Sequence, residues 1–283
     1  MGGVRSWCTS SNSPKALLAA YGLRPKKRLG QHFLMDGGTA ARIARLAVER
    51  PGERVVEIGA GTGALTAALV AAGAAVTAFD VDAQMVGVLR SRDDIGSARI
   101  ECADALAFDY AAWAGTAPWT AAGNLPYNIA TPLMLRLAEL PHPPQRVVAM
   151  IQKDVAQRLT AKPGTASYGS LTVAIAHKMS VRRAFSVGPA QFFPRPNVDS
   201  AVVVLQPHTV PPVVPADPAL FAAVVRGAFA YRRKTLANSL AIALSIPRDR
   251  IANVLRGLHL NPEIRGEELD LATFAALADA LAG

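Results

Sequence analysis

Cysteines and long apolar runs are both scarce in this 283-residue sequence. The two cysteines, Cys8 and Cys102, are too few for a disulfide framework, which favours a reducing, cytoplasmic setting. No apolar run reaches the roughly 18 residues that a membrane-spanning helix needs, and the N-terminus lacks a secretory pattern. The five histidines are scattered without the spacing of metal ligands. We expect a soluble cytoplasmic protein that acts as a monomer, with no metal site and no membrane partner.

Acidic residues are rare in two stretches of the chain. Residues 1–50 hold 9 Lys and Arg against 2 Asp and Glu, and residues 145–195 hold 8 against 1. Residues 52–144 between them hold 5 against 10, and the formal net charge of the whole chain is +9. Two basic blocks favour a polyanionic partner such as nucleic acid, because phosphate contacts release counterions. A solvated basic face is the alternative.

Short apolar runs alternate with helical patterns between residues 54 and 151. The patterns predict strands at 54–58, 75–79, 99–102, 119–123 and 146–151, and helices at 64–72, 83–90 and 131–140. Such alternation predicts an α/β fold with a mostly parallel, Rossmann-like sheet and helices on both of its faces. The apolar run at 201–205 is typical of a further buried strand.

Five prolines between residues 207 and 218 mark a boundary, because proline at this density resists both helix and sheet. The patterns beyond it predict helices at 220–230, 235–244, 248–257 and 271–281. We therefore expect a tail with a short helix at 1–20, an α/β domain at 21–207 and a small all-helical domain at 208–283. The polar residues 1–13 suggest a disordered tail or a misplaced start codon, with an organelle presequence as the alternative.

A glycine-rich segment, Glu57-Ile58-Gly59-Ala60-Gly61-Thr62-Gly63, follows the first strand and opens a helix. Glycines at such a turn let the backbone approach a ligand and adopt positive φ. Dinucleotide folds carry G-x-G-x-x-G at this place. The G-x-G-x-G spacing after an acidic residue favours S-adenosyl-L-methionine over NAD, with Gly59 and Gly61 as contacts. A merely tight turn between strand and helix is the alternative.

Carboxylates follow the second and third strands. Asp80 lies 17 residues beyond Gly63 at the end of its strand, where it can accept both ribose hydroxyls of a nucleotide. It can instead cap the helix that begins near Ala83, a role that Asp82 can also fill. Asp104, just past the third strand, can accept the adenine amino group of the cofactor or can cap its own loop.

The most specific signal follows the fourth strand, at Asn124-Leu125-Pro126-Tyr127. An exocyclic adenine amine is a poor nucleophile because its lone pair is delocalised into the ring. The Asn124 carboxamide oxygen and the carbonyl of Leu125 or Pro126 can accept its two N–H bonds and aim the lone pair at a sulfonium methyl group, with no strong base. The Tyr127 ring offers a face on which an extruded base stacks. We predict methyl transfer to such an amine, with a purely structural turn as the alternative.

Motifs in a fixed order resemble the KsgA/Dim family of ribosomal RNA adenine dimethyltransferases over nearly the whole chain from about Tyr21. They are KRLGQHFL (27–34), EIGAGTGALT (57–66), NLPYNIATP (124–132), QKDVAQRL (152–159), YGSL (168–171), FFPRPNVDS (192–200) and FAYRRKTL (229–236). The resemblance implies a class I methyltransferase sheet and contacts to S-adenosyl-L-methionine at His32, Leu34, Gly59, Asp80, Asp104 and Asn124. It also implies dimethylation of two adjacent adenosines in the 3′-terminal hairpin loop of small-subunit (16S) rRNA. The immature small ribosomal subunit is then the partner, and the protein takes part in its assembly.

Two positions depart from the commonest form of that family, since His32 stands where Asn is frequent and Asp80 where Glu is frequent. We expect Phe192 to supply the opposite wall of the base pocket, with Phe193 as its competitor. Two clusters of basic residues are expected to contact RNA phosphate. Lys26, Lys27 and Arg28 lie in a loop that closes over the cofactor, and Arg232, Arg233 and Lys234 lie at the opening of the helical, RNA-binding domain.

Three other functions compete with this interpretation. A sister group of enzymes methylates large-subunit RNA and confers antibiotic resistance with the same NLPY chemistry, but the RRKTLANSL segment (232–240) favours the small-subunit group. A non-catalytic RNA-binding assembly factor on the same fold is the second, and the intact Asn124, Asp80 and Gly59 argue against it. NAD-linked redox chemistry is the third, and it leaves the NLPY segment without a purpose.

Overall fold

The computed structural model describes residues 13–283 and divides the chain into two compact units. Unit 1 comprises the chain up to Ala156 together with Arg182–Pro207, and unit 2 comprises Gln157–Val181 and His208–Gly283. The chain thus leaves unit 1 at residue 207, where the prolines begin. The segment 157–181 groups with unit 2, however, whereas the sequence placed it in the α/β domain. The tail expected at residues 1–13 and Cys8 fall outside the described residues, apart from Ser13, which caps the first helix.

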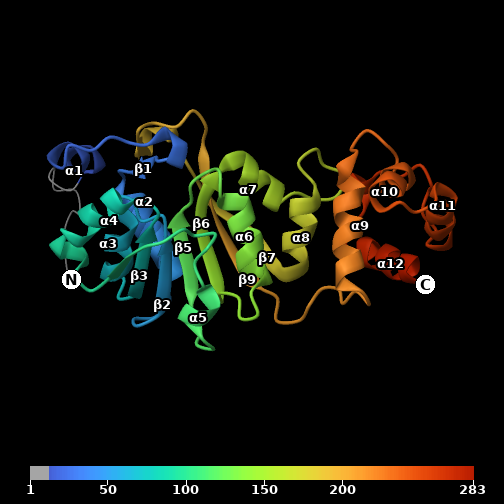
Figure 1. The fold of residues 1–283 in the computed structure, drawn as a ribbon, viewed down its shortest axis with the longest axis horizontal. Coiled ribbons are helices and arrows are strands. Elements are labelled where there is room, and N and C mark those ends of the chain that lie inside the picture. The colour runs from blue at the N-terminus through green and yellow to red at the C-terminus, as the bar shows by residue number, and fades with distance from the viewer. Residues whose placement is uncertain (1–12) are drawn as a thin grey trace. The chain divides into compact units, whose positions relative to one another are not determined.

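Unit 1 is built on a mixed sheet, which in the described residues has seven strands in the order β4-β3-β2-β5-β6-β9-β7 (Figure 1). The strands are β2 Arg54–Ile58, β3 Ala75–Asp80, β4 Arg99–Cys102, β5 Thr120–Asn124, β6 Arg146–Gln152, β7 Met179–Val187 and β9 Ser200–Pro207. The pairs from β4 to β6 are parallel, and β9 runs antiparallel to β6. The carboxyl ends of β2, β3 and β5 therefore meet at one edge, where ligands bind in such sheets.

Helices flank the sheet on both faces, as the sequence predicts. The helices that begin in this unit are α1 Pro14–Ala20, α2 Gly37–Ala47, α3 Ala64–Ala71, α4 Ala83–Arg90, α5 Tyr110–Ala114, α6 Ala130–Glu139 and α7 Lys153–Leu159. Its 3₁₀ turns are η2 Lys27–Leu29 in the basic loop, η3 Asp93–Ile95 and η4 Pro189–Gln191. A two-residue strand β1 (Phe33–Leu34) pairs antiparallel with β8 (Phe192–Phe193). This pairing brings the segment before β1 beside the proline-rich segment after β8.

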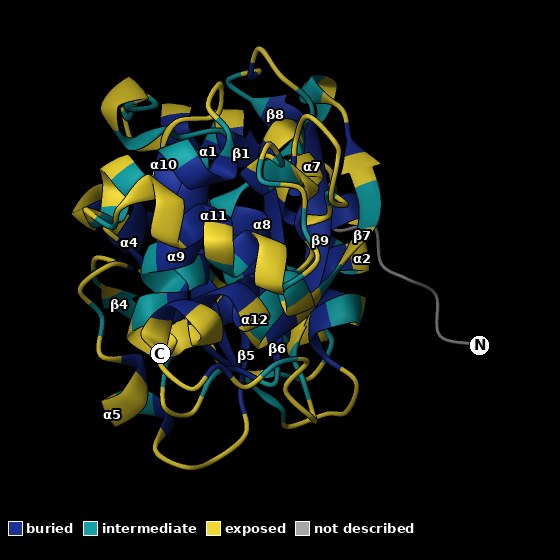
Figure 2. Ribbon diagram, turned by 90° about the vertical axis from the view of Figure 1, so that its right-hand side faces the viewer, coloured by how far each residue is buried: buried dark blue, intermediate teal, exposed yellow. Residues whose placement is uncertain are grey.

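Unit 2 is helical and has its own core. Its helices are α8 Ser170–Lys178, α9 Pro218–Ala230, α10 Leu236–Leu244, α11 Arg248–Gly257 and α12 Leu271–Ala282, with the 3₁₀ turn η5 Gly266–Glu268. Tyr168 and Val173 from the 157–181 segment pack in the same buried cluster as Val224 and Leu240, which explains why that segment belongs to this unit. Figure 2 shows the buried and exposed stripes of these amphipathic helices. Within residues 13–283, no helix combines the length and the apolar character needed to cross a bilayer.

Candidate active site

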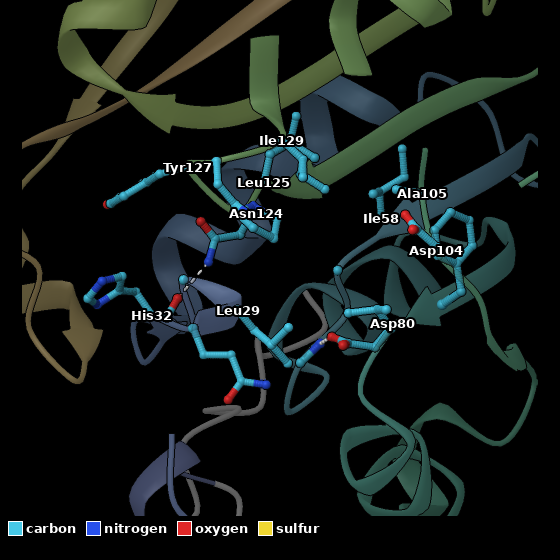
Figure 3. Close-up of a pocket in the computed structure, with 18 of the residues that line it drawn as sticks. Leu29, His32, Ile58, Asp80, Asp104, Ala105, Asn124, Leu125, Tyr127 and Ile129 are labelled. Carbon is cyan, nitrogen blue, oxygen red and sulfur yellow. Dashed lines mark hydrogen bonds between the residues drawn. The ribbon is translucent and has the colours of Figure 1, made fainter. Parts of the chain in front are cut away.

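A cavity of about 210 Å³ opens at the carboxyl edge of the sheet, and we call it the Asp80 cavity (Figure 3). Its walls come from the segment 29–33, from the ends of β2, β3 and β5 and from the loop after β4. The structure brings most of the predicted site residues together here. Those that line it are His32, Gly59, Gly61, Asp80, Asp104, Asn124, Leu125, Pro126 and Tyr127.

The glycine turn is fixed to the end of β3 by Asp80. The amide of Gly61 donates to Asp80 Oδ2 at 2.9 Å, and the amide of Asp82 donates to Oδ1 at 2.9 Å. Gly61 has φ 55°, and a Cβ there would lie 2.8 Å from the Phe33 ring, so only glycine fits. Burial raises the pKa of Asp80, while the two amide donors oppose that rise. Each carboxylate oxygen keeps room for one more donor, as a ribose hydroxyl requires.

The helix-capping role that competed for Asp80 belongs to its neighbour. Asp82 Oδ1 accepts from the amide of Gln84 at 3.1 Å in the first turn of α4. Asp104 performs the local role that the sequence left open, because its Oδ1 accepts from the amide of Leu106 at 2.8 Å. Asp104 nevertheless lines the Asp80 cavity, so its second oxygen is available to a ligand amine there.

The Asn124 carboxamide is oriented by a backbone carbonyl. Asn124 Nδ2 donates to the carbonyl oxygen of His32 at 2.8 Å, which fixes the amide so that Oδ1 is left to accept from a ligand (Figure 3). The carbonyl of Pro126 already accepts from the amide of Ile129 at 3.1 Å. Among the described residues no such backbone bond engages the carbonyl of Leu125. The structure therefore favours Leu125 over Pro126 as the second acceptor.

The Tyr127 ring is held at both ends. Its hydroxyl lies 3.1 Å from the hydroxyl of the fully buried Ser200, and its ring lies 5.5 Å from the imidazole of His32 with an interplanar angle of 27°. Burial raises the pKa of the Tyr127 phenol, so the ring stays neutral at physiological pH. A neutral, fixed aromatic face is what a stacked base requires.

A second cavity of about 630 Å³ adjoins the first, and we call it the Arg195 groove. It shares Gly30, Gln31, His32 and Tyr127 with the Asp80 cavity. Its other lining residues are Pro25, Lys27, Gln152, Pro194, Arg195, Pro196, Asn197 and Val198. Arg195 was not among the predicted site residues, although a cation inside the FFPRPNVDS motif was a visible signal. The groove carries two cations, Lys27 and Arg195.

The expected wall residue Phe192 does not reach either cavity. It is 2% exposed and packs in the core with Leu34, its partner in the β1–β8 pair. Phe193 packs on the other side, against the cluster that contains Leu17 and Met85. The pairing turns the Phe192 side chain into the core, so it lines neither cavity in this structure, and its place in the base pocket stays a prediction. Leu34 is also buried, and it lines only a small cavity of about 20 Å³ beside the glycine turn.

The first basic cluster divides into two roles. Lys26 Nζ donates to Asp82 Oδ1 at 2.7 Å, and Gln31 Nε2 donates to Asp82 Oδ2 at 2.9 Å. These bonds tie the segment that lines the Asp80 cavity to the chain just after β3. Lys26 is thus engaged in the protein, whereas Lys27 and Arg28 are exposed. The charges available to RNA are those of Lys27 and Arg28.

The second basic cluster lies in unit 2, in the turn between α9 and α10 rather than at the opening of the helical unit. The Arg232 guanidinium donates to the carbonyls of Ala166 and Tyr168 at 3.0 and 2.9 Å, so it holds the loop before α8 in place. Arg233 and Lys234 are exposed, and no described residue pairs with their side chains. Arg232 is thus engaged within unit 2, whereas the charges of Arg233 and Lys234 face solvent.

Comparison with known proteins identifies the family. The family model described as ribosomal RNA adenine dimethylase matches residues 22–274. The chain belongs to this family. It is 43% identical to ribosomal RNA small subunit methyltransferase A of Magnetococcus marinus, over 94% of this chain and 95% of that protein. The Pseudomonas aeruginosa protein of the same name is 41% identical, over 93% and 96%.

Two solved structures share the fold across most of the chain. A dimethyladenosine transferase from Plasmodium falciparum superposes with a TM-score of 0.73 at 25% identity, covering 87% of this chain and 96% of that one. The 23S rRNA methyltransferase ErmE superposes with a TM-score of 0.67 at 25% identity, covering 89% and 100%. The expected class of fold, a Rossmann-like methyltransferase sheet with a C-terminal helical region, is confirmed.

The cofactor of this family, S-adenosyl-L-methionine, fits the residues present. The buried Asp80 carboxylate can hold the ribose, the second oxygen of Asp104 can accept the adenine amine, and the Cβ-free turn at Gly59 and Gly61 leaves space for the methionine part. A Cβ at Gly59, which has φ 72°, would lie 3.4 Å from Pro126. The turn therefore brings the cofactor site and the Asn124 segment to contact distance.

Proposed function

We propose that this protein places two methyl groups on the amino nitrogen of each of two adjacent adenosines in the 3′-terminal hairpin loop of small-subunit rRNA. The observation that carries the proposal is the oriented Asn124 carboxamide beside Leu125 in the wall of the Asp80 cavity. The Asn124 oxygen and the Leu125 carbonyl match the two N–H bonds of an adenine amine. The substrate in the cell is the immature small subunit, and the modification belongs to its assembly.

The chain contributes orientation and electrostatics rather than a base. Asn124 Oδ1 and the Leu125 carbonyl accept the two amine hydrogens, which draws the nitrogen toward tetrahedral geometry and localises its lone pair on that atom. Tyr127 holds the base through its ring face. S-adenosyl-L-methionine, when bound, supplies an electrophilic methyl group on a positively charged sulfur. The proton of the methylated amine leaves to solvent, because nitrogen acidity rises once the new bond forms.

Small-subunit RNA is favoured over large-subunit RNA by the relatives. Proteins about 40% identical over nearly their whole length carry the name small subunit methyltransferase A, whereas the large-subunit enzyme ErmE is 25% identical. A non-catalytic assembly factor would not need the Asn124 amide to be oriented or the Asp80 carboxylate to be buried beside the glycine turn. Both features are present.

RNA binding is assigned to exposed cations in both units. In unit 1 these are Lys27, Arg28 and Arg195, and in unit 2 they are Arg233 and Lys234. Changing Arg233 to Gln should lower the slope of log affinity against log salt by about one phosphate contact. Arg226, which is exposed on α9 outside the basic turn, gives a matched Gln variant that should leave the slope unchanged. Equal slopes for the wild-type protein and for the Arg233 and Arg226 variants would show that Arg233, in the turn between α9 and α10, does not contact RNA phosphate.

The activity is tested with purified protein, labelled S-adenosyl-L-methionine and immature small subunits. Mass mapping of the rRNA should find two adjacent dimethyladenosines in the 3′-terminal hairpin, and mature large subunits serve as the competing substrate. Asn124→Ala should abolish transfer while subunit binding remains. Label only in large-subunit RNA would favour the other branch of the fold, and no label in either would contradict an enzymatic function.

A further inference from the structure

Two basic blocks of the sequence meet on one face of unit 1. Helix α2 belongs to the basic block at residues 1–50, and β7 belongs to the basic block at residues 145–195. The guanidinium carbon of Arg42 on α2 lies 3.6 Å from the centroid of the Phe185 ring on β7. Arg183 projects from β7 on the same side as Phe185, because side chains alternate along a strand, and Arg45 follows Arg42 after about one turn of α2. We call Arg42, Arg45 and Arg183 the α2–β7 patch.

The charge of the patch is not balanced within the described part of the protein. Its three arginines are exposed, and none of them forms an ion pair with another residue of the range 13–283. The nearest acids along α2 are engaged elsewhere. The Asp36 carboxylate accepts from the amide of Thr39 at 2.7 Å, and the Glu49 carboxylate pairs with Arg146. Unbalanced cations gathered on one face attract a polyanion.

The Arg42 side chain is held in a binding-competent position by the Phe185 ring. A guanidinium stacked on an aromatic face keeps its N–H donors in its own plane, where they can bind a phosphate through two parallel hydrogen bonds. β7 ends the order of the sheet, and exposed cations on an edge strand also prevent pairing with another chain. That role accounts for Arg183 but not for the two arginines of the helix.

The surface beside the patch is shallow and made of small residues. A groove of about 190 Å³ lies between α2 and α3, and Arg45 is the charged residue among those that line it. The other lining residues are glycine and alanine. A protein partner would need deeper pockets for aromatic or long apolar side chains, whereas a sugar-phosphate backbone needs a floor that lets it come close to cations. The patch therefore fits nucleic acid better than protein.

The patch is connected to the Arg195 groove through the β1–β8 pair. Helix α2 follows β1, and the groove residues Pro194 and Arg195 follow β8. In the first turn of α2, Thr39 Oγ1 donates to Gln191 Oε1, just before β8, at 2.6 Å. Arg45 lies about 12 Å along the helix from its first residue. RNA that occupies the groove can therefore continue onto the patch.

We propose that the α2–β7 patch binds the phosphate backbone of rRNA outside the hairpin that carries the target adenosines. Arg42, held flat on Phe185, takes one phosphate through two of its N–H donors, and Arg183 takes a second. Arg45 adds a third contact from the rim of the alanine groove. The patch is then a second RNA contact of unit 1, separate from the cations beside the Asp80 cavity and the Arg195 groove. This inference rests on the proposed action on rRNA.

The experiment measures how salt weakens the binding of the full-length protein to immature small subunits. Removing two phosphate contacts with the double variant Arg42→Gln and Arg183→Gln should lower the slope of log affinity against log salt by about 1.4–1.8. The matched control is the double variant Arg90→Gln and Arg99→Gln, which removes the same charge beside β4, at the opposite edge of the sheet. The control should keep the wild-type slope. Equal slopes for the two double variants would overturn the inference.

A charge-preserving variant separates loss of charge from loss of fold. Arg42→Lys with Arg183→Lys keeps both cations, so it should keep most of the wild-type slope. A Lys variant whose slope falls as far as that of the Gln variant would show that charge is not what the patch supplies, and would overturn the inference. Chemical footprinting of the rRNA adds a readout of place. Wild-type protein should protect a segment outside the 3′-terminal hairpin that the Gln variant leaves accessible, while both protect the hairpin itself. Identical footprints would also contradict the inference.

Protein-free small-subunit rRNA distinguishes RNA from a ribosomal protein as the partner of the patch. The difference in slope between the wild-type protein and the Gln variant should persist on this RNA. A difference seen with subunits alone would assign the patch to a protein partner and overturn the inference. Failure of the proposed function is distinguishable, because binding and footprints need no methyl transfer, whereas that failure would show as wild-type protein that leaves the subunits unmethylated.

Discussion

The buried carboxyl of Glu57 makes the stability of unit 1 depend on pH. Glu57 is the penultimate residue of β2, is 1% exposed, and has one carboxyl oxygen without a hydrogen-bond partner among the described residues. Burial raises its pKa from 4.5 to about 8. The folded state therefore prefers the protonated acid, while the unfolded chain carries the carboxylate at neutral pH.

The size of the effect follows from linkage. Because the pKa of Glu57 is higher in the folded state than in the unfolded chain, its burial does not reduce the free energy of unfolding below pH 4.5. That free energy falls as the pH rises from 4.5 toward about 8. At pH 7 the unfolded chain has released the proton and the folded state has largely kept it, which costs about 3 kcal/mol relative to an acidic solution. Glu57→Gln removes this titration without changing the shape of the side chain. The variant should gain about 2–3 kcal/mol at pH 7, or roughly 4–12 °C in Tm.

The assay is thermal unfolding followed by tryptophan fluorescence, without cofactor, from pH 5 to pH 9. Trp113 and Trp119 both lie in unit 1, so their fluorescence reports the unfolding of that unit. The wild-type Tm should fall across this range more steeply than that of Glu57→Gln, and the two curves should approach each other near pH 5. Glu53→Gln, a change of the half-buried carboxyl just before the same strand, is the control. Parallel curves, or a Gln variant less stable at pH 8, would refute a protonated Glu57.

Two further predictions concern the frame of the site. A Cβ on Gly123 would lie 2.5 Å from the carbonyl oxygen of Ile58, so Gly123→Ala should cost about 1–3 kcal/mol in unfolding free energy. Gly87→Ala is the control and should give a small gain, because nothing lies within 4 Å of a Cβ there. Equal Tm shifts for the two variants would contradict the close approach of β2 and β5. Lys26→Gln frees the cavity segment from Asp82, so calorimetry should find a Kd for S-adenosyl-L-methionine about 3-fold to 10-fold higher, with the salt slope of RNA binding unchanged. A lower slope with normal cofactor affinity would make Lys26 a phosphate contact after all.

The sheet was largely predictable because its strands are short and apolar. The strand at 54–58 was predicted with its observed bounds, and those at 75–80, 120–124 and 146–152 within a residue at each end. The strand Met179–Val187 was missed. It lies at the sheet edge, and its MSVRRAFSV pattern carries exposed arginines instead of an apolar run. Edge strands often carry such charges, which remove the usual signal.

The residues around the cofactor could be predicted from the order of the strands, whereas those around the acceptor base could not. Parallel strands bring Gly61, Asp80 and Asn124 to one edge by topology alone. The position of Phe192 depends on the register of a two-residue pairing with β1, which no local pattern encodes. His32 likewise lies next to Tyr127 across 95 residues of sequence. Contacts of this kind come from tertiary packing, so they appear only in the structure.

The orientation of Asn124 leads to a last prediction, on Asn124→Asp. A carboxylate cannot donate to the His32 carbonyl, so at pH 8 it would place oxygen against oxygen at the 2.8 Å now spanned by the hydrogen bond. The variant should lose about 100-fold or more in kcat there, comparable to the loss of an oriented donor in other enzymes. A protonated Asp can donate to that carbonyl and still accept on its other oxygen. Its kcat should therefore rise as the pH falls from 8 to 6, whereas wild-type kcat should not rise with acid. Parallel pH profiles for the two proteins would show that the bond to His32 does not orient the acceptor.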